Sequence, residues 1–132
     1  MIDTIGGTVV MVSDQKKAVD FYTKALGFEV KVDLPFGTMR WIEVAPKGGE
    51  SSISLMEPNL QMMSKDQFES AMRSLGEETG IWFYTKDIKS THEELMKQNV
   101  NITQPEKQEW GGTMSKIRDL DGNSFSLISS PT

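Results

Sequence analysis

The feature that most constrains the fold of this chain is an internal repeat with a period of about 72 residues. Each half contains a β-branched or aromatic run, then an amphipathic segment that starts at an aspartate, then an alternating hairpin. Asp14 and Asp87 take equivalent places, as do Ser54 and Ser126. Both halves therefore predict the order β-α-β-β-β and an α+β fold class. Two unrelated α+β halves are the alternative that the pattern leaves open.

The first half has the signals of one complete unit. Asp14, with Ser13, can cap a helix through side-chain oxygens, and Gly27 supplies its stop. One apolar helix face is formed by Ala18, Phe21, Tyr22, Ala25 and Leu26. Strands are expected at 8–12, 28–32, 38–44 and 52–56.

A connector and a second unit follow. Pro58 breaks the strand before it, and Ser64 with Gln67 fits a capping box for a short helix. In the second unit, Asp87 caps a helix that carries Ile88, Leu95 and Met96. Strands are expected at 81–85, 100–103, 114–118 and 124–128, with the turn sequence Asp-Leu-Asp-Gly-Asn before the last of them.

Composition excludes several classes of protein. With 132 residues, a single domain with one ordinary core is expected. A net charge of −5 argues against binding to a nucleic-acid backbone. The chain has no cysteine, so disulfides and cysteine-bound zinc are excluded. No apolar run approaches the length of a membrane span, and the N-terminus lacks the plan of a signal peptide, so a cytoplasmic protein without membrane partners is expected.

Two motifs resemble the vicinal oxygen chelate superfamily, which includes glyoxalase I, bleomycin- and fosfomycin-resistance proteins and extradiol dioxygenases. Val12–Phe28 reads Val-Ser-Asp-x-x-x-Ala-x-x-Phe-Tyr-x-x-x-Leu-Gly-Phe, and Asp119–Leu127 matches the closing motif with Leu120 in place of proline. The resemblance implies one domain over 1–132, with module one at about 1–57, a connector at about 58–78 and module two at about 79–132. It also implies a curved mixed sheet around a cleft, helices on the outer face, and a homodimer.

The metal enzymes of that superfamily place ligands at four strand positions, usually His, Glu or Gln. Here the resemblance maps those positions onto Gly7, Ser54, Gly80 and Ser126. Glycine has no ligand atom, and a neutral hydroxyl is a poor donor to a divalent ion. The single histidine, His92, is expected on the solvated side of the second helix. We therefore expect no metal and no cofactor.

Strand alternation predicts which side chains face the cleft. Ile42 and Val44 fit the helix side, which turns Trp41 and Glu43 to the cleft. Counting along the hairpins aligns Lys116 with Val44 rather than with Glu43. Arg118 is a further polar group on this side, whereas Thr8 is expected under the helix. The expected ligand-binding residues are Met11, Trp41, Glu43, Ser54, Met56, Trp82, Tyr84, Trp110, Lys116 and Ser126.

Aromatic walls with a few polar groups are typical of sites that bind flat small molecules. The leading hypothesis is a metal-independent binder of an apolar or aromatic small molecule. One alternative is an enzyme of the same superfamily, of lyase, isomerase or dioxygenase type. Such an enzyme would be metal-free, with Lys116 or Glu43 as its catalytic acid or base, or would use a metal site that the pattern does not reveal. The other alternative is an interaction module with an idle cleft.

Overall fold

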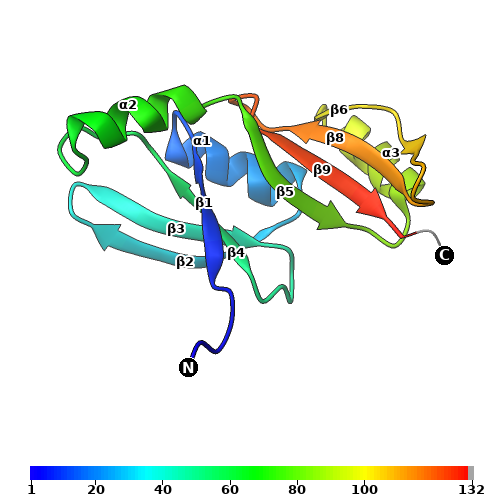
Figure 1. Cartoon of the computed structure of the whole chain (residues 1–132), viewed down its shortest axis with the longest axis horizontal. Helices are drawn as coiled ribbons and strands as arrows, with labels where there is room; N and C mark the ends of the chain where they lie inside the picture. The colour runs from blue at the N-terminus through cyan, green and yellow to red at the C-terminus, as the bar shows by residue number, and fades with distance from the viewer. Residues whose placement is uncertain (131–132) are drawn as a thin grey trace. The chain divides into compact units, whose positions relative to one another are not determined.

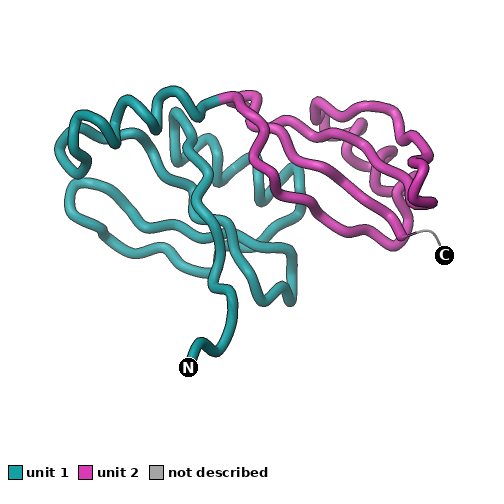
Figure 2. Tube along the Cα trace, in the orientation of Figure 1, with its two compact units in different colours: residues 1–75 teal, residues 76–132 magenta. Residues whose placement is uncertain are grey.

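A computed structural model of the chain describes residues 1–130, which form two compact units (Figure 2). Unit 1 is Met1–Leu75, and unit 2 begins at Gly76. Each unit combines one mixed sheet with one or two helices, so the predicted α+β class is confirmed.

Unit 1 has four strands and two α-helices (Figure 1). Strand β1 is parallel to β4, and the other neighbours are antiparallel, in the order β1-β4-β3-β2. The elements are β1 (Gly7–Met11), α1 (Gln15–Asp20), η1 (Phe21–Ala25), β2 (Glu29–Phe36), β3 (Met39–Ala45), β4 (Ser52–Met56) and α2 (Lys65–Ser74).

Unit 2 repeats this topology. Strand β5 is parallel to β9, and the order is β5-β9-β8-β6, with the short β7 also paired to β8. In both units the first strand lies beside the last, so the two units share one topology, as an internal duplication requires. The elements are β5 (Glu78–Tyr84), α3 (Ile88–Lys97), β6 (Asn101–Ile102), β7 (Glu106–Lys107), β8 (Thr113–Arg118) and β9 (Ser124–Ser129).

The predicted helix starts are confirmed. The side chain of Asp14 accepts a hydrogen bond from the backbone of α1, and Asp87 does the same for α3. Ser64 and Gln67 form a reciprocal capping box at α2. The first helix departs from expectation, because its α-helical part ends at Asp20 and continues as a π-helix. None of the helices within residues 1–130 has both the length and the apolarity needed to cross a membrane.

The inward face of α3 corrects the expectation for His92. His92 is buried, with 9% of its surface exposed, whereas Met96 is 50% exposed. Ile88, His92 and Leu95 are spaced at i, i+4 and i+7, so they share one face, and Met96 lies to its side. Helical spacing, rather than polarity, decides which of these side chains is buried.

The turn before β9 is built around a buried aspartate. The Oδ1 atom of Asp119 accepts hydrogen bonds from the backbone N–H groups of Asp121 at 3.0 Å and Asn123 at 2.9 Å. Asn123 Nδ2 donates to Asp119 Oδ2 at 2.9 Å, and its Oδ1 accepts from the Gly76 backbone at 2.9 Å. This turn therefore ties the start of unit 2 to the strand that closes it.

Candidate functional site

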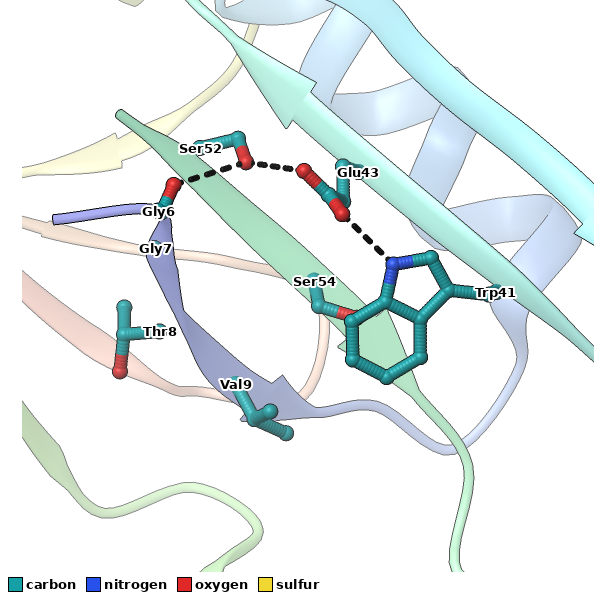
Figure 3. Close-up of a pocket in the computed structure, with 8 residues that line it drawn as sticks. All are labelled: Gly6, Gly7, Thr8, Val9, Trp41, Glu43, Ser52 and Ser54. Atoms are coloured by element: carbon teal, nitrogen blue, oxygen red, sulfur yellow. Dashed lines mark hydrogen bonds between the residues drawn. The ribbon is translucent and has the colours of Figure 1, made fainter. Parts of the chain in front are cut away.

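Unit 1 contains a pocket of about 230 Å³ over β1, β3 and β4 (Figure 3). Because alternate residues of a strand share a face, Trp41 and Glu43 of β3 and Ser52 and Ser54 of β4 all reach it. The intervening Ile42 is buried on the other side. The lining residues are Gly6, Gly7, Thr8, Val9, Trp41, Glu43, Ser52 and Ser54.

The carboxylate of Glu43 lies between two neutral donors. Trp41 Nε1 donates to Oε2 at 2.6 Å, and Ser52 Oγ donates to Oε1 (Figure 3). The bond from Ser52, followed by the bond from Trp41, lowers the pKa of the Glu43 carboxyl below its ordinary value, although desolvation by partial burial acts in the opposite direction. Glu43 is therefore held as an anion. The Trp41 ring is fixed further by an edge contact with Phe36, with ring centroids 5.8 Å apart.

Ser54 is the second polar group of the pocket. It lies directly opposite Glu43 in the β3–β4 register. Only 4% of Ser54 is exposed, and its Oγ has no hydrogen-bond partner within the described part of the chain. A buried hydroxyl without a partner costs about 1–3 kcal/mol, so this atom is available to a bound molecule.

The residues at the four mapped metal positions do not fit a metal ion. The Gly7 backbone lies so close to β4 that a Cβ built there would be 2.2 Å from the carbonyl oxygen of Ser52. Gly80 has φ +74° beside a register shift in β5, which favours glycine over any residue with a ligand atom. Within residues 1–130, no three His, Cys, Asp or Glu side chains are grouped as metal ligands. The nearby Glu57 is engaged by the Gln15 backbone N–H at 2.7 Å, at the start of α1.

Unit 2 has its own polar cluster on the equivalent strands. Lys116 Nζ lies 2.8 Å from Glu78 Oε2 and donates to Ser126 Oγ at 3.0 Å. The bond from Lys116 is the main cause that lowers the pKa of the Glu78 carboxyl. Glu78 was missed in the sequence because the strand was expected to begin at Ile81. Extending the alternation backwards from Trp82 and Gly80 would have found it.

The register corrects the alignment of the two hairpins. Glu43 pairs with Ser54, and Lys116 pairs with Ser126. Lys116 therefore corresponds to Glu43, and the predicted alignment with Val44 is wrong. The connection from β3 to β4 is one residue longer than that from β8 to β9, and the count along the sequence could not place the extra residue.

The other predicted residues lie elsewhere within their own units. Met11 pairs with Met56 at the ends of β1 and β4. Trp82 is 56% exposed on β5, and Tyr84 is 77% exposed beside a second hollow lined by Thr85, Lys86 and Ser130. Two positions remain, Trp110 and Thr8, and the second differs from what the sequence suggested.

Trp110 lies over the backbone of its own loop, because a Cβ on Gly112 would be 2.0 Å from its ring. Thr8 was expected under the helix, but it is exposed and lines the pocket. Strand β1 is an edge strand of its sheet, where alternation constrains burial least.

Comparison with known proteins gives one consistent result. The family model described as Glyoxalase/Bleomycin resistance protein/Dioxygenase superfamily matches residues 4–127. The uncharacterized protein YetH of Bacillus subtilis (strain 168) is 36% identical over 129 residues, which cover 96% of this chain and 98% of YetH. Two crystal structures are similar over almost the whole chain.

The first of these is a member of the same superfamily from Sphaerobacter thermophilus DSM 20745. It has a TM-score of 0.85 and 33% identity, and the match covers 98% of each chain. The second is TnmS3, an antibiotic binding protein from Streptomyces sp. CB03234. It has a TM-score of 0.76 and 32% identity, and the match covers 97% of this chain and 96% of TnmS3.

Proposed function

The chain belongs to the Glyoxalase/bleomycin resistance protein/dioxygenase superfamily, and we propose that it is a metal-independent binder of an apolar or aromatic small molecule. The observation that carries the proposal is the pocket of unit 1, where the Trp41 indole adjoins a charged carboxylate and a buried hydroxyl without a partner. An aromatic wall with few polar groups suits a flat ligand whose orientation is fixed by hydrogen bonds.

Two further observations support this proposal. Glycine and serine occupy the positions where the metal enzymes of the superfamily carry their ligands, and the backbone at Gly7 leaves no room for a side chain. TnmS3, which is similar over nearly the full length, is an antibiotic binding protein. For this chain we also propose the binding of an organic molecule, and we propose that the molecule is not converted chemically.

A metal-free enzyme of the superfamily is the competing function. It would need Glu43 or Lys116 as acid or base. The hydrogen bonds to Glu43 lower its pKa, which makes it a weak base, and Lys116 is already paired with Glu78. The site therefore supports binding better than catalysis. Turnover of a bound ligand that Glu43→Gln or Lys116→Ala abolishes, while binding is spared, would favour the enzyme.

Tryptophan fluorescence provides the test. The chain has three tryptophans, Trp41, Trp82 and Trp110, and a ligand in the unit 1 pocket should quench Trp41. We expect saturable quenching by members of a panel of aromatic compounds, and we expect Trp41→Phe to remove most of the signal. Trp110→Phe is the matched control, since this ring lies on its own loop. Absence of saturable binding by every compound, checked by calorimetry, would overturn the proposal.

A further inference from the structure

Among the described residues of the chain, no lysine or arginine forms a salt bridge with the carboxylate of the unit 1 pocket. Both hydrogen bonds to Glu43 come from neutral groups, the Ser52 hydroxyl and the Trp41 indole. None of the salt bridges found within residues 1–130 includes Glu43. Glu78 gives a comparison inside the same chain, because a lysine ammonium lies 2.8 Å from its carboxylate. Glu43 has no such partner in the part of the chain that the structure describes.

The duplication shows that this difference lies at one position of the fold. Glu43 and Lys116 occupy equivalent places, each opposite the serine of the neighbouring last strand. Unit 2 supplies a cation there, and that cation bonds to both its serine and a carboxylate. Unit 1 supplies an anion instead, and the serine opposite it, Ser54, keeps a buried hydroxyl without a partner.

Together these groups select a positively charged ligand atom. Each carboxylate oxygen of Glu43 accepts one hydrogen bond. Each therefore still has a lone pair that can accept a further N–H donor. Ser54 Oγ can accept as well, and a donor brought by the ligand would satisfy it. The indole of Trp41 adds a wall that favours cations over anions, and Val9 contributes apolar surface.

We propose that the unit 1 pocket binds a cationic nitrogen, a protonated amine or amidine carried by an apolar or aromatic body, with Glu43 as counter-ion and Ser54 as second polar contact. This inference rests on the proposed small-molecule binding and names the class of ligand. A carboxylate or phosphate ligand is disfavoured, since it would meet the Glu43 charge at close range.

Three probes of one shape test the inference: 2-naphthylmethylamine, which is cationic, 2-naphthylmethanol, which is neutral, and 2-naphthoate, which is anionic. Each is titrated into the protein by calorimetry and tryptophan fluorescence at neutral pH. We expect the amine to bind about tenfold or more tightly than the alcohol, and the acid to bind more weakly than either. Raising the salt concentration should lower the affinity for the amine and should not lower the affinity for the other two probes.

Variants assign the effect to the pocket. Glu43→Gln should lower the affinity for the amine about tenfold. Its affinity for the alcohol should stay within about twofold of that of the unaltered protein, so binding of the alcohol also shows that the variant is correctly folded. Glu50→Gln removes the same charge from the exposed β3–β4 connection and should change neither affinity. Equal affinities for amine and alcohol in the unaltered protein would overturn the charge inference and leave small-molecule binding intact. Failure of all three probes to bind would overturn both. If Glu43→Gln does not fold, the salt dependence of amine binding decides, and its absence counts against the inference.

Discussion

At the scale of the residue, Glu43 shows which part of a site can be derived from alternation and which part cannot. The two-residue period of a strand places Trp41 and Glu43 on one face of β3, whereas Ser54 joins them through the pairing of β3 with β4. The bond from Ser52 follows from the pairing of β3 with β4, because Ser52 shares a face with Ser54. The lowered pKa of Glu43 depends on those donors and could not be derived from its position in the chain.

The donors to Glu43 lead to a prediction about its titration. Ser52→Ala removes the bond that most lowers the pKa of Glu43, so the pKa of this carboxyl should rise towards its ordinary value of 4.5. Carbon-13 NMR of the glutamate side chains would measure the shift. Ser54→Ala is the matched control, since Ser54 Oγ makes no bond to Glu43. An equal shift in both variants would contradict the assignment.

The same lowered pKa makes stability depend on pH. A carboxyl whose pKa is lower in the folded state stabilises the fold above its unfolded pKa, and this contribution is lost as pH falls through the folded pKa. The free energy of unfolding should therefore decline below about pH 4.5 partly through Glu43. In urea titrations from pH 6 to pH 3, we expect Glu43→Gln to show a shallower decline than the unaltered protein. A decline of the same size in both would show that Glu43 contributes nothing.

At the scale of the element, the sequence predicted the order of the strands better than their exact bounds. The first and last strands of each unit are parallel neighbours in both sheets, so the two halves share one topology, as the repeat implied. The errors were local. The β3–β4 connection has one residue more than its counterpart, and β5 begins three residues before the expected Ile81. Alternation shows which face a residue takes, but it does not show where strand pairing begins or ends, and element boundaries are the least predictable part of a sequence.

Helix α3 illustrates the same limit. His92 was assigned to solvent on polarity, yet it is buried and its Nε2 has no partner within residues 1–130. Its spacing from Ile88 places it on the inward face, and tertiary packing overrides the preference of the side chain.

The turn that closes unit 2 gives a prediction for an element. Asn123 is 2% exposed and links Asp119 to the Gly76 backbone. Asn123→Ala would leave a buried carboxylate oxygen and a backbone N–H without these partners, so it should lower the free energy of unfolding by about 2–4 kcal/mol. Urea denaturation followed by circular dichroism would measure the loss. Leu120→Ala, in the same turn and 64% exposed, should change stability by less than about 0.5 kcal/mol. Similar losses in both variants would rule out the hydrogen-bond network as the cause.

At the scale of the whole molecule, the duplication separates architecture from chemistry. Two units share one topology, but the equivalent strand positions carry Glu43 in one and Lys116 in the other. Backbone hydrogen bonds define the sheet, and the outward side chain of an alternating strand can change without altering it. This freedom explains why the fold could be derived from the repeat, whereas the ligand could not.

Association is a second property of the whole chain. We expect a homodimer, as the superfamily resemblance implies, and the edge strand β2 exposes three apolar side chains, Val30, Leu34 and Phe36. Exposed apolar edges are usually covered by a partner. Sedimentation equilibrium should give about twice the chain mass of 14.8 kDa, and Leu34→Glu should weaken the association if this edge takes part. A mass of one chain at all concentrations tested would contradict the expectation.

Independence from metal is the prediction that involves both units at once, because two of the mapped positions lie in each. None of the four offers an imidazole or a carboxylate, and at Gly7 a side chain would collide with the β4 backbone. Substituting one histidine should therefore not create a site: Ser54→His supplies one ligand where at least three are needed. We expect dialysis against EDTA to leave the affinity for an aromatic probe unchanged, and elemental analysis of the purified protein to find far less than one zinc, nickel, manganese or iron per chain. Stoichiometric metal that is lost on dialysis together with probe binding would contradict the proposed function directly, since it would show a ligand set outside these four positions.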